Sequence, residues 1–190
     1  MAELPAMTRA EGEALLEYLK EVPEDKWDTA TVCAPWTVRH LVAHLTALSN
    51  QTLPNFARRM IATGFNFQKV VDGDLQKYLT TKDDMLAKLT SSIASPTTPK
   101  MLNEVALGEF MVHGEDIRRA LGDRGEHPSE HVAAIGAMYA TAKKPLNGRV
   151  RTQGLSLRAT DGGFTWGQGP EVAGPGIDLY SMRQPLGVVA

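Results

Sequence analysis

Apolar residues recur at helical spacing through the first three quarters of the chain. Leu15, Leu16 and Leu19 form one apolar stripe in a segment that ends near Pro23, because residues three or four positions apart share one face of a helix. The same spacing continues in four further segments, which cover residues 37–49, 81–93, 100–121 and 128–144. Between them lie breaks rich in proline or glycine, at 95–99 and 122–125. The pattern predicts a helical bundle.

Two polar patterns are typical of helix N-termini. Thr8-Arg9-Ala10-Glu11 has the form of a capping box and predicts that the first helix opens there. Thr81 is a second candidate cap. Pro54 interrupts the chain after the second helix, and a continuation is expected around residues 56–61. Residues 64–80 contain glycine and give no clear pattern.

The pattern changes character after Arg149. Residues 155–160 alternate between apolar and polar, as in a strand. Asp161-Gly162-Gly163 is a hairpin turn signal, so residues 164–166 are expected to form the return strand. A short last helix is expected around residues 177–182.

These elements predict a fold of the α+β class that is mainly α. We expect a helical bundle over residues 1–147 and a small α/β C-terminal domain over residues 148–190. The composition agrees, since 43% of the 190 residues are apolar and 22% are charged, as in ordinary globular proteins. The net charge of -2 gives no electrostatic reason to expect nucleic acid or an anionic membrane as a partner.

The sequence predicts neither a secretory signal nor a transmembrane helix. No apolar run approaches the length of a transmembrane helix, and the first residues lack the basic and apolar regions of a secretory signal. Cys33 is the only cysteine, so an internal disulfide is not possible. We therefore expect a cytoplasmic protein.

The candidate chemistry lies in two histidine motifs on predicted helices. Glu109 and His113 are four residues apart, so both side chains project from one face of a helix. If the helix that carries His44 packs beside it, two imidazoles and one carboxylate meet. This ligand set is typical of a catalytic zinc site with one open position. Asp116 follows on the same face and is a candidate to orient His113 or to transfer a proton.

Each of these residues also has an ordinary structural interpretation. An isolated Glu-x-x-x-His pair is common, and Glu109 could face solvent while the histidines are half-buried with hydrogen-bond partners. His40 lies four residues before His44 and could also be a ligand, or it could be exposed. Cys33 could be a soft ligand, although its place before Ala34-Pro35-Trp36 favours packing between the loop and the next helix.

Three stretches of the chain resemble the mycothiol-dependent maleylpyruvate isomerase family. The first signature of that family is similar to Cys33-x-x-Trp36-Thr37-Val38-Arg39-x-Leu41-Val42-Ala43-His44-Leu45. The second signature is similar to Glu109-x-x-x-His113-x-x-Asp116-Ile117-x-x-Ala120-x-Gly122. The small sterol-carrier-like C-terminal domain of the family is similar to residues 154–161 and 169–179.

The resemblance implies a DinB-like four-helix bundle that holds a divalent metal, usually zinc (Zn2+), through His44, Glu109 and His113. It implies that Asp116 is catalytic and that mycothiol enters the open metal position. Position 40 is commonly Asp in the family and is His here. The Gly-Arg pair near the end of the family's C-terminal domain is missing, so we expect an incomplete domain in which Arg183 is the candidate for binding the cosubstrate or substrate.

The expected chemistry is an attack by a thiol on a small electrophile. A free thiol with a pKa of about 8.5 is mostly protonated at neutral pH, and a bound metal favours its deprotonation. Thiolate addition gives an S-transferase, and addition followed by elimination gives a cis–trans isomerase of the maleylpyruvate type. The alternatives are a metal-binding bundle that acts as a binding or stress-response module, and metal-assisted hydrolysis. We expect a monomer or a homodimer.

Overall fold

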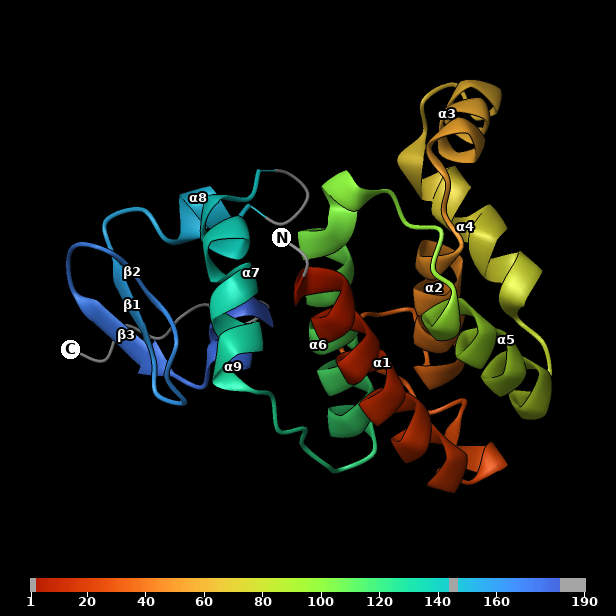
Figure 1. The fold of residues 1–190 in the computed structure, drawn as a ribbon, viewed down its shortest axis with the longest axis horizontal. Helices are drawn as coiled ribbons and strands as arrows, with labels where there is room; N and C mark the ends of the chain where they lie inside the picture. Colours follow the sequence, from red (N-terminus) through yellow and green to blue (C-terminus); the bar gives the residue numbers. More distant parts are fainter. Residues whose placement is uncertain (1–2, 144–146, 182–190) are drawn as a thin grey trace. The chain divides into compact units, whose positions relative to one another are not determined.

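The computed structural model describes residues 3–143 and 147–181. The chain divides into two compact units, residues 1–125 and 126–190, and Figure 1 shows the elements of each. The first unit is built on four long helices: α1 (Glu3–Glu21), α2 (Val38–Ser49), α5 (Lys82–Ala94) and α6 (Asn103–Ala120). Because α1 and α2 each pack against both α5 and α6, the four helices close around one core. This arrangement confirms the predicted bundle.

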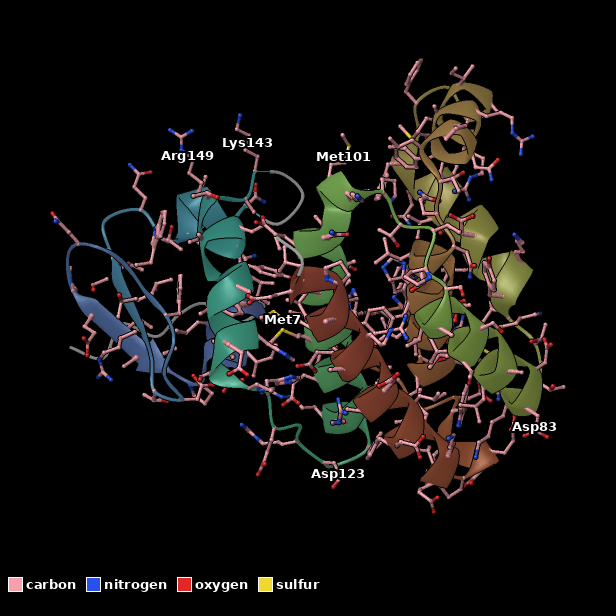
Figure 2. All side chains as sticks on the ribbon, viewed as in Figure 1. Met7, Asp83, Met101, Asp123, Lys143 and Arg149 are labelled. Atoms are coloured by element: carbon pink, nitrogen blue, oxygen red, sulfur yellow. The ribbon has the colours of Figure 1, made fainter. Side chains whose placement is uncertain are left out.

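The core of the bundle follows the apolar stripes of the sequence. Leu15 and Leu19 on α1, Leu41 and Leu45 on α2, and Leu89 on α5 are fully buried, and side chains fill the space between these helices (Figure 2). Burial of each such side chain contributes about 1.5–3 kcal/mol. The stripes therefore fix which faces of the helices point inward.

The first helix begins earlier than the capping-box pattern predicts. α1 starts at Glu3, and the Thr8 hydroxyl donates to the carbonyl of Leu4 at 2.9 Å inside the helix. The predicted start at Thr8 is therefore wrong. The proline in the first turn explains the early start, since Pro5 has no N–H to lose there. The second prediction is confirmed, because Thr81 accepts a hydrogen bond from the backbone of Asp84 and caps α5.

Two shorter helices connect α2 to α5. The helix α3 (Leu53–Ala62) is capped by Thr52 and carries Pro54 in its first turn, so the proline starts this helix. The helix α4 (Phe67–Tyr78) occupies the stretch that had no clear pattern, and Asn66 caps it. α4 packs on α2, whereas α3 contains no fully buried residue. The pair therefore extends the bundle beside α2 (Figure 1).

The second unit combines helices with a small sheet. α7 (Ser129–Thr141) packs with α8 (Gly148–Arg151) and α9 (Gly176–Ser181). The strands are β1 (Ser156–Ala159), β2 (Thr165–Gly167) and β3 (Glu171–Gly174), in the order β2-β1-β3. β1 pairs antiparallel with β2, as the turn signal predicts, and parallel with β3, which the sequence pattern did not reveal. The mainly helical α+β class is confirmed.

The boundary between the two units differs from the predicted division at residue 147. The two compact units divide between Gly125 and Glu126, because α7 packs with the helices that flank the sheet. α7 also packs against Phe164, which lies between β1 and β2: a Cβ atom on Gly136 would lie 2.2 Å from this ring, so only glycine fits there. None of the helices in the described ranges is long and apolar enough to cross a membrane.

Candidate metal centre

The three predicted ligands come together between α2 and α6. The Nε2 atom of His44 lies 2.9 Å from Oε2 of Glu109, and Nε2 of His113 lies 3.1 Å from the same oxygen. The potential ligand atoms of the three residues all lie within 4.8 Å of one another. One carboxylate oxygen therefore faces two imidazole nitrogens contributed by two different helices.

The packing of the two helices sets this geometry. On α2 the neighbours of His44, Leu41 and Leu45, belong to one buried apolar cluster with Phe110 and Ile117 of α6. Since α2 and α6 pack against each other, these apolar side chains fix the spacing between the helices. The i, i+4 spacing then places Glu109 and His113 one turn apart on the facing side of α6.

The cluster is partly accessible to solvent. The side chain of His44 is 19% exposed, that of Glu109 is 22% exposed and that of His113 is 10% exposed. Solvent therefore reaches the cluster, as a catalytic metal site with an exchangeable ligand requires.

A second set of contacts is made at the other ring nitrogen of His113. Its Nδ1 atom lies 3.0 Å from Oδ2 of Asp116, whose side chain is 4% exposed. The thiol of Cys33 donates to the same Oδ2 at 3.2 Å, and its sulfur lies 3.7 Å from Nδ1. An ionised carboxylate can only accept, so Nδ1 of His113 is the donor in this pair. In a neutral ring, Nε2 then carries the lone pair.

The orientation of the His113 ring indicates whether the centre can hold a cation. With Nδ1 donating to Asp116, a neutral His113 presents its Nε2 lone pair to a carboxylate oxygen of Glu109 only 3.1 Å away. Two acceptors at this distance repel unless a positive charge lies between them. A proton on Nε2 satisfies this requirement, and so does a metal ion. The donor set therefore fits a divalent cation.

The pKa shifts of Glu109 and His113 also show that the site favours a positive charge beside the carboxylate. Burial raises the pKa of the Glu109 carboxyl, but the charges and hydrogen bonds of His113 and His44 outweigh burial and hold this pKa well below its ordinary value. Burial lowers the pKa of His113, but the charge of Glu109 and the hydrogen bond to Asp116 raise it well above 6.5. The site thus stabilises a carboxylate next to a cation.

The distances are also close to those of a coordinated ion. Ligand atoms bound to one zinc at about 2.0–2.1 Å lie about 3.3 Å apart in tetrahedral geometry. The two contacts to Glu109, 2.9 and 3.1 Å, are shorter than this value by a few tenths of an ångström. Small side-chain movements of that size would admit the ion without a change in the fold.

The loop before α2 supports both the candidate ligand His44 and the cysteine. The backbone N–H groups of Val38 and Arg39 donate to the carbonyls of Thr29 and Trp27, at 3.0 and 2.8 Å, so the loop satisfies the free donors at the start of α2. The ring of Trp36 packs against His44 with 5.2 Å between centroids. The loop therefore fixes where α2 begins and how the His44 ring is oriented.

Cys33 has a closer relation to the site than the sequence suggested. Cys33 packs against the core of the bundle, in line with the predicted packing role, and its thiol also contacts Asp116 and His113. Cys33, His113 and Asp116 form a second group of potential ligand atoms. The signal was weak, because a single cysteine in a loop does not show which distant residue it meets.

His40 and Arg183 complete the set of sequence candidates. Nδ1 of His40 accepts from the backbone N–H of Thr37 at 3.4 Å and lies 2.8 Å from its hydroxyl oxygen, so His40 caps α2. Within the described residues it belongs to neither group of potential metal ligands. Arg183 lies outside the described residues.

The fold and the centre together define a class of protein, namely a four-helix bundle with a two-histidine, one-carboxylate candidate metal site. Residues 8–95 match the family model described as the mycothiol maleylpyruvate isomerase N-terminal domain. This segment of the chain is therefore similar to that domain. It contains His44 and Cys33. No curated protein and no solved structure matched the chain.

Proposed function

We propose that the chain is a metal-dependent enzyme that uses mycothiol to attack a small electrophile, either as an S-transferase or as a cis–trans isomerase. The observation that carries the proposal is the convergence of His44 and His113 on one oxygen of Glu109. The family name supports the choice of thiol, because the matching domain is described by its relation to mycothiol.

The proposed metal is held by His44, Glu109 and His113, and zinc is the ion that we expect. When bound, a divalent ion would lower the pKa of a coordinating thiol and supply its thiolate at neutral pH. The charge of Glu109 offsets part of the positive charge at the site, and the two imidazoles are neutral ligands that leave room for an anionic sulfur. Other divalent ions suit the same donor set, so the test below includes them.

Asp116 acts through His113 in this proposal. Its buried carboxylate accepts the Nδ1–H of His113, which keeps the Nε2 lone pair directed at the metal position. The thiol of Cys33 occupies the same carboxylate oxygen. These contacts favour the orienting role that the sequence allowed for Asp116. Its predicted role as a catalytic acid or base requires the kinetic test given in the Discussion.

The proposal includes the reactants and the cellular compartment that the sequence led us to expect. The reactants are a small thiol and a small electrophile, and a thiol-dependent reaction needs a reducing compartment such as the cytoplasm. A contribution of Arg183 to binding of the thiol or the substrate also stays part of the proposal.

A conjugation assay with the purified full chain tests the function. The chain is stripped with chelator and then loaded with zinc, nickel or iron(II). Each form is supplied with mycothiol and the uncharged electrophile 1-chloro-2,4-dinitrobenzene, and product is followed by absorbance. We expect turnover that requires both metal and thiol and that falls at least 100-fold in His44→Ala. The matched control, His40→Ala, changes a histidine on the same helix outside the ligand group and keeps its turnover within about threefold.

The other outcomes separate the alternatives. Turnover of an activated ester without any thiol would replace the proposal with metal-assisted hydrolysis. Metal binding with no turnover, and with no mycothiol binding in calorimetry, would assign the chain to a non-catalytic metal-binding module. Full activity in the His44→Ala variant would contradict the proposal directly.

A further inference from the structure

An apolar pocket adjoins the candidate metal centre. It has a volume of about 260 Å³, and His44 forms part of its wall. The same residue therefore faces the ligand group and the pocket. The rest of the wall comes from α2, from the α3–α4 pair beside it and from the first turns at α6, including Leu48, Phe56, Phe67, Val71 and Val105. All of these elements belong to the first unit.

Aromatic side chains shape the outer part of this pocket. The rings of Phe56 and Phe67 meet edge to face, with 6.4 Å between centroids and 68° between planes. Phe67 is 55% exposed and Leu53 is 46% exposed, although both are large apolar side chains. Exposed apolar side chains at the edge of a concave site are typical of ligand-binding surfaces. Edge-to-face aromatic contacts also provide a template for a further ring.

Two polar groups of the pocket wall are already paired with an arginine outside it. Besides His44, the lining includes Gln51 and Asp74. The guanidinium of Arg59 forms an ion pair with the carboxylate of Asp74 and donates to the amide oxygen of Gln51. Among the described residues, no lysine or arginine lines the pocket. Because Arg59 is engaged by Asp74, the wall offers a carboxylate ligand no cation of its own.

We propose that this pocket binds the electrophile and selects an uncharged aromatic compound with a single ring. The inference rests on the proposed function for the reaction and on the pocket for the choice of substrate. Size supports it, because an apolar cavity of about 150 Å³ holds benzene, so about 260 Å³ accommodates one ring with substituents. The adjacency of His44 places the ring next to the position that the thiol would occupy.

The reaction with such a compound balances without any further reactant. In a substitution on a chloronitrobenzene, the thiol loses its proton to the solvent, a carbon–sulfur bond forms and the carbon–chlorine bond breaks. Chloride leaves with the bonding electron pair. No oxidant or reductant is required, and the pocket contributes by holding the ring and excluding charge.

Binding can be tested without catalysis. The probe is 1,3-dinitrobenzene, which is uncharged and lacks a leaving group, and its binding to the full chain is measured by ligand-observed NMR in metal-free and zinc-loaded protein. We expect binding in both forms. Phe67→Ala should weaken it about tenfold, since the lost contact is aromatic and apolar. The matched control Phe65→Ala removes a ring that is 73% exposed and outside the pocket wall, so affinity should not change.

The charge selection is tested with a matched pair of substrates. 4-Chloro-3-nitrobenzamide and 4-chloro-3-nitrobenzoate have nearly the same shape and differ in charge. We expect kcat/KM with mycothiol to be at least tenfold higher for the amide. Asp74→Asn removes the carboxylate of the wall and should narrow this ratio at least threefold. Phe65→Ala should leave the ratio unchanged.

The outcomes distinguish failure of the pocket from failure of the function. Probe binding that depends on Phe67, combined with no thiol-dependent turnover, would uphold the pocket and reject the enzyme. Turnover with equal preference for amide and benzoate would uphold the enzyme and overturn the substrate inference. Absence of probe binding, or equal weakening by Phe65→Ala and Phe67→Ala, would also overturn it.

Discussion

A metal ion bound by the candidate centre would connect two helices, and removing the ion should therefore lower thermal stability. His44 belongs to α2, whereas Glu109 and His113 belong to α6. Because the three side chains converge only in the folded chain, bound zinc would stabilise the native state by mass action. At free zinc 1,000-fold above its dissociation constant, the gain is about 4 kcal/mol. For a domain of this size, that gain corresponds to a rise in Tm of about 12–20 °C.

The assay can be confined to the unit that holds the centre. Trp27 and Trp36 belong to the first unit and Trp166 to the second. In a Trp166→Phe background, tryptophan fluorescence during heating reports on the bundle alone. The zinc-loaded chain is compared with the same chain in excess chelator. Both are repeated with His44→Ala, and with His40→Ala as the control for loss of a histidine from α2.

The two histidine variants should respond differently to zinc. His44→Ala should lose most of the zinc-dependent shift, because only Glu109 and His113 remain. His40→Ala should melt earlier with and without zinc, since it loses a helix cap, but it should keep the shift between the two conditions. Identical melting of the unsubstituted bundle in zinc and in chelator would show that no ion bridges the helices. A full shift in His44→Ala would place the ion elsewhere.

Three further predictions concern residues around the centre and in the second unit. Asp116→Asn should lower zinc affinity about 10–100-fold in competition titrations, because the amide weakens the acceptor that orients the imidazole ligand; a bell-shaped pH–rate profile that loses one limb would instead assign Asp116 an acid–base role. Leu45→Ala should destabilise the bundle by about 2–5 kcal/mol in urea unfolding, since this side chain is fully buried beside His44. Gly163→Ala should destabilise the second unit by about 1–3 kcal/mol, measured by urea unfolding, because φ is +83° and the new Cβ would lie 2.3 Å from the Ser129 carbonyl oxygen.

The bundle was predictable because its determinants are local and periodic. The stripe of Leu15, Leu16 and Leu19 is buried as its spacing requires, and the cap at Thr81 lies where the sequence indicates. The hairpin from β1 to β2 follows from Asp161-Gly162-Gly163 in the same way. In each of these cases, residues within four positions of each other determine the structure.

Features that depend on distant parts of the chain were not predictable. β3 pairs parallel with β1 through residues that lie outside the turn signal, and its run of only four residues is too short to predict a strand from the sequence. The assignment of α7 to the second unit rests on packing with α8 and α9. The early start of α1 has another cause, since Thr8 matches a capping pattern and yet donates inside the helix. A local pattern indicates a possible cap, but the helix begins earlier where the preceding residues can also form a helical turn.

The candidate centre was predictable in its members but not in its supporting contacts. Spacing placed Glu109 and His113 together, and the apolar surroundings of His44 suggested a facing helix. No pattern in the sequence indicated that Cys33 would meet Asp116, because the two are brought together by the course of a loop. His40 shared the favourable spacing and serves as a cap instead. Sequence spacing therefore identifies candidate ligands, and the packing of the helices determines which of them come together.

Because the candidate ligands come from only two helices, one distance determines the size of the centre. Glu109 and His113 move as one body, because the rise and turn of α6 fix their separation. The span that remains is the distance from His44 to that pair, and the buried apolar side chains that pack between α2 and α6 determine it. Substituting those side chains with larger or smaller ones would widen or narrow the gap without replacing any candidate ligand. Preference among ions of different radius could thus be changed from the interior of the bundle, at positions that never touch the ion.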